Sequence, residues 1–229
     1  DVLEIDFGIK SFTLGFKQYN KIFIQSHGWI QFGNPSLSWI EYLSTFLSKP
    51  GIAIPWDDFF LQQGGTDNKI GYKITDDQFI VSYDTSEYSE YNTVQMMLTL
   101  NFDNHAEPGT ITFDFGQVDS NDGLLGISYG NNPTNTINFA TLDTKETFIY
   151  PNESHQLFLE SDNLGVELSY SRLVFTKSNF ETIGSIGFIV SKDNNTAYEK
   201  PTENKGYIPW SDVTDDSFKE IYFTGNSFT

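Results

Sequence analysis

The sequence predicts an all-β protein, an antiparallel β-sandwich with short helical turns. Apolar residues recur with a period of two in many short runs, which is typical of strands with one buried face. Gly, Asn and Asp separate nearly every run, as expected for tight turns between antiparallel strands. Aromatic residues make up 16% of the 229-residue chain, 21 of them Phe. That content is enough to fill a sizeable core.

Near the N-terminus, strands are predicted at residues 21–25 and 29–32. Apolar residues at positions 39, 40, 43, 46 and 47 then fall at helical spacing. Residues 36–47 are therefore predicted to form a short helix or helical turn, ended by Pro50 and Gly51.

The strongest strand signal lies in residues 93–102, where only Met97 breaks the alternation. Residues 110–115 repeat the pattern, and a turn-rich loop over 103–109 joins the two runs. This combination predicts a β-hairpin. Further strands are predicted at 69–74, 78–83 and 124–129.

Strand patterning is dense up to residue 178 and sparse beyond it. We therefore predict a β-sandwich domain over 1–178 and a C-terminal extension over 179–229. Residues 191–229 are mostly polar, but strand-like runs occur at 183–190 and 220–223. The extension would add edge strands or lead into a further domain.

The net charge of the chain argues against some classes of binding partner. The chain has 13 Lys plus Arg against 31 Asp plus Glu, a net charge of −18. Such a chain repels phosphate backbones and anionic lipid headgroups, which argues against nucleic acid and membrane surfaces as partners. No apolar run approaches the roughly 18 residues of a membrane helix. Cysteine is absent, which removes disulfides and thiolate metal sites.

Signals for catalysis are weak. His27, His105 and His155 are widely separated, so we expect turn or surface residues and no metal-binding histidine pair. Ser128 lies in a Gly-x-Ser-x-Gly pattern, but no helical pattern follows it as a nucleophile elbow requires. We predict that Ser128 is a strand residue.

One enzymatic alternative depends on Glu4 and Asp6. They are spaced like part of the Glu-x-Asp-x-x-Glu motif of jelly-roll glucanases, but the third carboxylate is missing. A glycoside hydrolase needs two carboxylates flanking the scissile bond. Half of the motif does not supply the two catalytic carboxylates. We therefore predict that the protein is not an enzyme.

Calcium is the metal that an acidic, cysteine-free chain favours, because its ligands are oxygens on loops. The candidate ligands are Asp57, Asp58, Asp119 and Asp122. Turn formation alone also explains loops rich in Asp and Asn, so both interpretations stay open. Asn152 and Asn194 begin Asn-x-Ser/Thr sequons and are candidate glycosylation sites.

An ordered series of motifs is more specific. It comprises Gly28-Trp29-Ile30-Gln31-Phe32-Gly33, Ile54-Pro55-Trp56-Asp57-Asp58, Asn92-Thr93-Val94-Gln95, Phe113-Asp114-Phe115-Gly116 and Gly126-Ile127-Ser128-Tyr129-Gly130. Over residues 10–165 this order resembles the NIDO family, the extracellular domain named after nidogen, and related bacterial surface domains. His27 departs from the Asn usual in that family, and Ile54 intrudes before Pro55.

The resemblance implies adhesion and matrix roles and supplies no catalytic residue. These motif residues also have structural roles. Gly28 and Gly33 would permit turns, and Trp56 would bury its ring against the sandwich. Asp57 and Asp58 are expected to turn the chain toward solvent.

These observations predict a non-catalytic extracellular or surface module for adhesion or matrix association, within a larger surface protein. Its partners would be an extracellular protein, a glycan or copies of itself, at the cell or virion surface. Two alternatives stay open. One is a calcium-dependent glycan-binding lectin. The other is a self-assembling coat or filament subunit, in which residues 191–229 pair with a neighbour's sheet edge.

Overall fold

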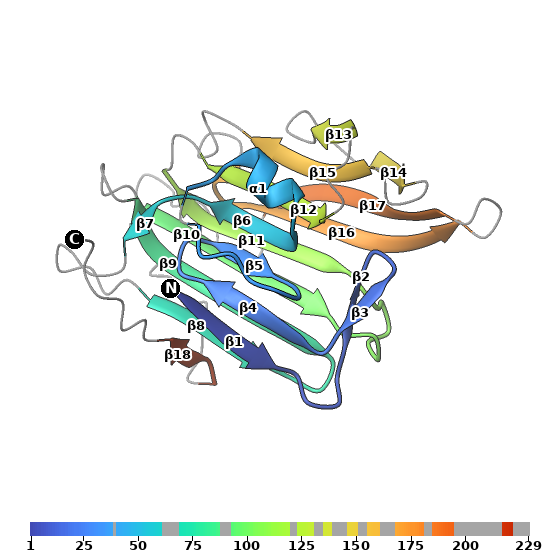
Figure 1. Ribbon diagram of the computed structural model, residues 1–229, viewed down its shortest axis with the longest axis horizontal. Helices are drawn as coiled ribbons and strands as arrows, with labels where there is room; N and C mark the ends of the chain where they lie inside the picture. The colour runs from blue at the N-terminus through green and yellow to red at the C-terminus, as the bar shows by residue number, and fades with distance from the viewer. Residues whose placement is uncertain are drawn as a thin grey trace.

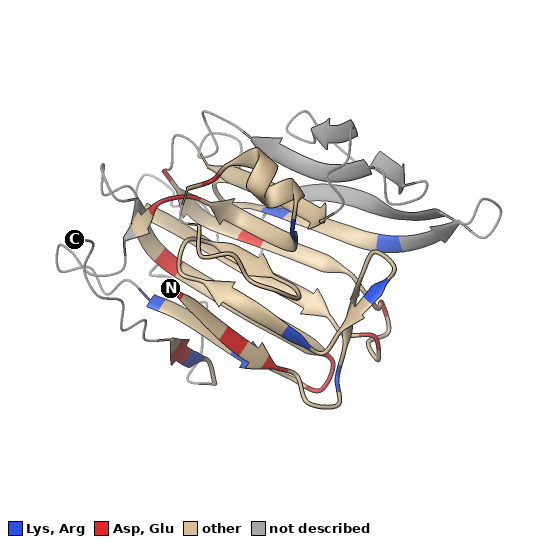
Figure 2. Ribbon diagram, viewed as in Figure 1, with Lys and Arg blue, Asp and Glu red and all other residues tan. Residues whose placement is uncertain are grey.

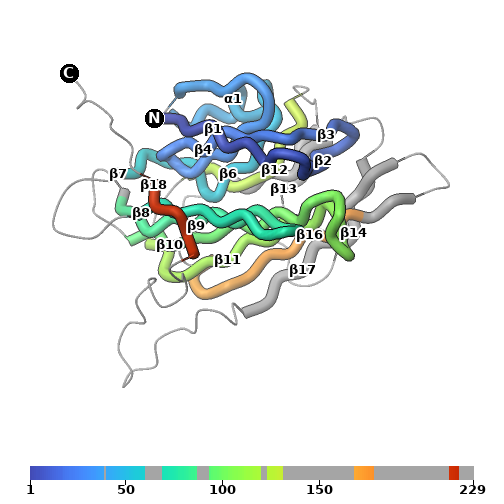
Figure 3. The backbone as a smooth tube through the Cα atoms, turned by 90° about the horizontal axis from the view of Figure 1, so that it is seen from below, coloured from blue at the N-terminus to red at the C-terminus, as the bar shows by residue number. Residues whose placement is uncertain are grey.

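The computed structural model describes residues 1–38, 40–60, 69–87, 93–119, 123–130, 135–138, 146–150, 155–160, 168–180, 185–194 and 217–221. Two large sheets form the two layers of a sandwich, seen edge-on in Figure 3. The predicted all-β class is confirmed. The fold is made of antiparallel strands, with one parallel pair in its described part, between β13 (Asn135–Asn138) and β15 (His155–Glu160).

The first layer is a seven-stranded sheet in the order β1-β4-β5-β6-β12-β15-β13. Besides β13 and β15, its strands are β1 (Val2–Asp6), β4 (Lys21–Gln25), β5 (Trp29–Gln31), β6 (Pro50–Trp56) and β12 (Leu124–Tyr129). A separate hairpin, β2 (Phe12–Leu14) with β3 (Lys17–Tyr19), lies at one end of these strands in Figure 1.

The second layer is a nine-stranded sheet in the order β14-β17-β16-β11-β10-β9-β8-β18, with β7 paired to β9. Its strands are β7 (Phe59–Phe60), β8 (Lys69–Ile74), β9 (Gln78–Glu87), β10 (Thr93–Asn101), β11 (Ile111–Val118), β14 (Glu146–Tyr150), β16 (Ser171–Phe180), β17 (Ser185–Asn194) and β18 (Lys219–Ile221).

The predicted hairpin is confirmed, because β10 and β11 pair antiparallel with Leu98 opposite Phe113. Strands 21–25, 69–74 and 124–129 form at the predicted residues. The run at 78–83 extends to residue 87, and the run at 29–32 ends one residue early.

Helix α1 (Leu43–Leu47) is much shorter than the predicted 36–47. The preceding residues hydrogen-bond to side chains of the sheet instead. The Gln31 side chain accepts from Ser36 N (2.5 Å) and donates to Ser36 O (3.1 Å), and Gln25 Nε2 donates to Ser38 O. The bonds to the Ser36 and Ser38 carbonyls occupy acceptors that a longer helix needs for its own ladder.

The main core lies between the two sheets. Fully buried aromatic rings dominate it, including Phe12, Phe32, Phe79, Phe102, Phe113 and Phe115. Tyr83 crosses the sandwich, donating from its buried hydroxyl to the Gln25 carbonyl at 2.8 Å. That bond satisfies a polar group whose burial is otherwise costly.

A second apolar cluster lies beneath α1, on the other face of the seven-stranded sheet. Trp29 and Trp56 stack there with ring centroids 4.3 Å apart, and Phe46 of α1 covers them. The expected burial of Trp56 is confirmed, since its side chain is fully inaccessible.

The described strands of the C-terminal region pair within this chain: β17 lies between β14 and β16, and β18 pairs with β8. The division at residue 178 stays a prediction. Within the described part of the chain, we find no helix with the length and apolarity needed to cross a bilayer.

Candidate functional site

The turn around His27 brings two sequence motifs together. Gly28 has φ 83°, and the Asp57 amide donates to the His27 carbonyl at 3.0 Å. The His27 Nδ1 accepts from the Phe59 amide at 3.2 Å and lies 3.6 Å from Asp58 Oδ1. Burial lowers the pKa of His27 to about 4, so the ring is neutral near pH 7. The expectation of a turn histidine is confirmed.

Asp57 does not face solvent as expected, since it is only 4% exposed. Its carboxylate turns back to accept from the Asp58 amide at 2.6 Å. Burial raises the pKa of the Asp58 carboxyl. No group of three His, Asp or Glu side chains in the described residues is arranged to hold a metal ion. The pair is therefore explained by the turn.

The other predicted site residues are not gathered around this turn. Asp119 is exposed after β11 and accepts from Gln117 Nε2 at 2.5 Å. Asn194 is the last residue of β17. Asp122 and Asn152 lie outside the described residues. Calcium binding and glycosylation stay predictions.

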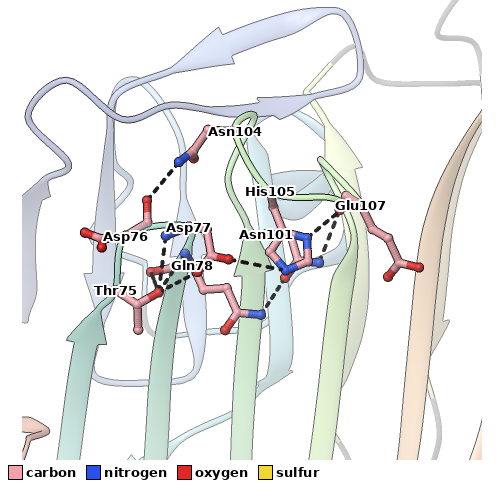
Figure 4. Close-up of polar contacts among 8 residues, drawn as sticks. All are labelled: Thr75, Asp76, Asp77, Gln78, Asn101, Asn104, His105 and Glu107. Carbon is pink, nitrogen blue, oxygen red and sulfur yellow. Dashed lines mark hydrogen bonds and ion pairs between the residues drawn. The ribbon is translucent and has the colours of Figure 1, made fainter.

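A polar network joins the turn between β8 and β9 to the loop between β10 and β11 (Figure 4). Asn104 Nδ2 donates to the Asp76 carbonyl at 3.0 Å, and His105 Nε2 lies 3.7 Å from Asp77 Oδ2. Gln78 Nε2 donates to Asn101 Oδ1 at 2.8 Å. These contacts fix the two loops against each other, so we assign the network to structure.

Asp103, in the same loop, anchors the β2–β3 hairpin. Its carboxylate accepts from Ser11 Oγ at 2.7 Å, from Thr13 N and Oγ1 at 3.1 and 3.0 Å, and from Gln18 Nε2 at 2.9 Å. Hydrogen bonds to a carboxylate are stronger than neutral ones. The hairpin, and with it Lys17, is held in place by this residue.

The nine-stranded sheet also carries buried polar groups. Asp84 accepts from Gln95 Nε2 at 3.2 Å, and Gln95 Oε1 accepts from the Gln117 amide at 3.3 Å. Asp114 and Arg172 face each other in the β11–β16 register, with Arg172 Nε 2.5 Å from Asp114 Oδ1. Because these groups are bonded to one another, we treat them as determinants of stability.

Asp84→Asn is expected to stabilise the protein at pH 8 by about 1–2 kcal/mol. Burial raises the pKa of Asp84 to about 6, against the opposing effects of Gln95 and Lys69. The folded state then holds the proton more tightly than the unfolded state, so stability falls as pH rises from about 4 to about 7. Asparagine keeps the acceptor for Gln95 and removes the charge. The measurement is the free energy of unfolding in urea, for the wild type and Asp84→Asn, at pH 5 and pH 8. If both proteins show the same pH dependence, the prediction is wrong.

A shallow cleft of about 330 Å³ combines several elements. Its walls are Lys17 of β3, the segment after β5, and the turn that joins α1 to β6. The lining residues are Lys17, Phe32, Gly33, Asn34, Ser48, Lys49 and Pro50.

Local structure explains how these segments meet. The Phe32 amide donates to the Pro50 carbonyl at 2.9 Å, extending the β5–β6 pairing. The buried Phe32 ring packs against Phe12 and Tyr19, with centroids 5.8 and 5.0 Å away. Gly33, with φ 83°, then turns the chain toward the rim.

Two of the residues that line the cleft are basic, Lys17 and Lys49. Figure 2 shows basic residues placed singly among acidic ones over much of the fold. Lys10, Lys21 and Arg172 lie within 4 Å of carboxylates. In contrast, neither Lys17 nor Lys49 has an ion pair or a side-chain hydrogen bond within the described structure, and Lys17 contacts only the Tyr19 ring, at 5.2 Å. The cleft therefore presents two uncompensated cations.

The lining offers binding groups and no evident catalytic pair. Its described residues include no carboxylate and no imidazole. The Ser48 hydroxyl donates to the Thr45 carbonyl at 2.7 Å. A hydroxyl nucleophile needs an adjacent base. The arrangement suits an anionic or strongly hydrogen-bonding ligand.

The fold and the cleft together define an all-β sandwich with a small cationic recess on a strongly acidic protein. Comparison of the chain with family models, with curated proteins and with solved structures gave no match. The resemblance to the NIDO family stays a prediction based on the motifs alone.

Sequence reasoning did not find this cleft. Lys17 and Lys49 come from segments separated by two strands and a helix, and no sequence pattern pairs them. What distinguishes them is that both line one recess, and that property appears only once the chain is folded.

Proposed function

We propose that this chain is a non-catalytic binding module for adhesion or matrix association, belonging to a secreted or surface protein, and that its ligand enters the Lys17/Lys49 cleft. The observation that carries the proposal is a recess with two cations that have no ion pair in the described structure, on a chain of net charge −18. Its volume lies at the lower end of the range for small-molecule sites.

The motifs that resemble the NIDO family support this role indirectly. Gly28 lies at a tight turn, and Trp29 and Trp56 stack in the cluster under α1. These residues serve the scaffold, which leaves recognition to loops at its rim. Loops held by a rigid scaffold commonly carry binding function.

The hydrolase alternative gains no support from β1. Glu4 lies 3.2 Å from Lys21, and the Asp6 carboxylate accepts from the Gly8 amide at 2.7 Å. β1 is the edge strand of its sheet, and both carboxylates are exposed. An exposed edge position does not supply the apolar surroundings that raise the pKa of a general acid.

Asn34→Trp is expected to abolish ligand binding without loss of folding. Asn34 lines the cleft, is exposed, and makes no side-chain hydrogen bond in the described structure. An indole there would fill the recess. The measurement is binding of the labelled protein to glycan and matrix-protein arrays. Ile9→Trp is the control, because Ile9 is fully exposed and is not among the lining residues.

The proposal stands if the wild type and Ile9→Trp bind the same ligand and Asn34→Trp does not. It fails if no array ligand binds, if Asn34→Trp binds normally, or if the bound glycan is cleaved. Loss of binding in chelator would favour the calcium-dependent lectin instead. Concentration-dependent growth in light scattering would favour the self-assembling subunit.

A further inference from the structure

Resting on the proposed function, we infer that the cleft recognises a sugar carrying a single carboxylate, such as a uronic acid unit. Lys17 and Lys49 line one recess, and neither has a carboxylate partner in the described structure. A ligand carboxylate would supply the missing counter-charge. Hydrogen bonds between ammonium and carboxylate groups are among the stronger polar contacts in proteins.

The volume of the cleft limits the size of the ligand. A volume of about 330 Å³ accommodates one or two sugar rings. The remaining groups of the lining suit hydroxyls: the Asn34 amide, exposed at the rim, offers both a donor and an acceptor. The Pro50 ring adds apolar surface for the carbon face of a sugar.

The charge of the whole protein argues for a ligand with one charge. Beyond the cleft, the net charge of −18 opposes every additional anionic group. Surface charges act over a Debye length of about 8 Å at physiological salt, so neighbouring units of a polysulfated chain would experience that repulsion. A glycan with isolated carboxylates satisfies the two lysines without this cost.

The strands beneath the cleft argue against an extended peptide. β5 is paired with β4 and β6, and β6 is paired with β5 and β12. A peptide that binds by adding a strand needs a free sheet edge. Neither β5 nor β6 offers one here, whereas β3, which carries Lys17, pairs only with β2 in the described structure.

The test compares methyl glucuronide with methyl glucoside, which differ only in the carboxylate. We expect titration calorimetry or ligand-observed NMR to show at least about tenfold tighter binding of the glucuronide, the gain expected from a charged hydrogen bond. Raising the salt concentration should weaken binding of the glucuronide and leave that of the glucoside unchanged.

Lys17→Ala and Lys49→Ala should each weaken glucuronide binding by about tenfold, and the double variant should remove it. Lys21→Ala is the matched control, because it removes the same unit of charge at the Glu4 pair, away from the cleft. Lys49 has no ion pair within the described structure, so thermal unfolding of Lys49→Ala should match that of the wild type. Lys17→Ala also loses the contact with the Tyr19 ring, and its melting temperature should fall by no more than a few degrees.

Equal binding of the two glycosides, or an equal loss in Lys21→Ala, would overturn the inference. So would tighter binding of a short acidic peptide such as acetyl-Asp-Glu-amide. If neither glycoside binds but an array ligand does, and Asn34→Trp removes that ligand, the sugar assignment is wrong and the binding module stands. If no array ligand binds at all, both proposals fail.

Discussion

Gly28→Ala is expected to prevent stable folding. At φ 83°, a residue with a side chain already loses about 1–2 kcal/mol relative to glycine. A Cβ at this position would lie 2.0 Å from the Pro55 carbonyl oxygen and 2.9 Å from the Phe59 ring. The Gly28 carbonyl is itself bonded to the Ile54 amide at 2.8 Å, so the two backbones cannot separate freely.

The total cost should exceed about 4 kcal/mol, which is exceptional for one substitution and comparable to the whole stability of many domains. Soluble yield and urea unfolding measure it. Gly8→Ala is the control, because Gly8 has φ 68° and a Cβ added there would meet no atom within 4 Å. We expect it to lose only about 1 kcal/mol. Similar losses in both variants would show that backbone conformation alone, and not the approach of Pro55, demands glycine at position 28.

This turn also illustrates what the sequence could reveal. The alternation in 93–102 and 110–115, with turn residues between, predicted the β10–β11 hairpin because both signals are local. Glycines 28 and 33 were expected at turns for the same reason, and both have positive φ.

Other features depend on contacts between distant segments. Nothing within 36–42 shows that Gln25 and Gln31 bond to its backbone, which is why the helix was predicted too long. Asp57 resembles a solvent-facing turn residue until the strand pairing brings His27 against it. Local patterns cannot report bonds of this kind.

The candidate site depends entirely on contacts between distant segments. Its two lysines line one recess because Asp103 fixes the β2–β3 hairpin and the β5–β6 pairing fixes the opposite wall. The adjacent pair Asp57–Asp58 was a candidate metal site in the sequence, yet turn hydrogen bonds account for it. Asp57 and Asp58 are adjacent in the sequence and were therefore noticed as a pair. Lys17 and Lys49 are far apart in the sequence and were not.

Arg172→Met is expected to destabilise the protein by about 3 kcal/mol at pH 8, the usual range for leaving a buried charge unpaired. Asp114 is only 3% exposed, and Arg172 is its ion-pair partner across β11 and β16. Methionine keeps much of the length of the side chain while removing the charge, so the loss reports the carboxylate more than the packing.

The pH dependence of that loss identifies its cause. Burial raises the pKa of Asp114, while Arg172 lowers it, and the net direction in the wild type is upward. Removing Arg172 raises the pKa further, so the folded variant binds a proton more tightly than the unfolded chain does. The destabilisation should therefore be greatest above the folded-state pKa and shrink as pH falls toward 5.

Asp114→Asn in the Arg172→Met background is the matched control, because it removes the charge that the single variant leaves unpaired. We expect the double variant to regain part of the lost stability at pH 8 and to show little change between pH 5 and pH 8. Urea unfolding of the four proteins at both pH values completes the cycle. If Arg172→Met loses the same stability at pH 5 as at pH 8, the cost arises from lost packing, and the buried carboxylate of Asp114 does not depend on Arg172 for its charge. In that case water reaches Asp114 between the strands, and the pair contributes little beyond a surface ion pair.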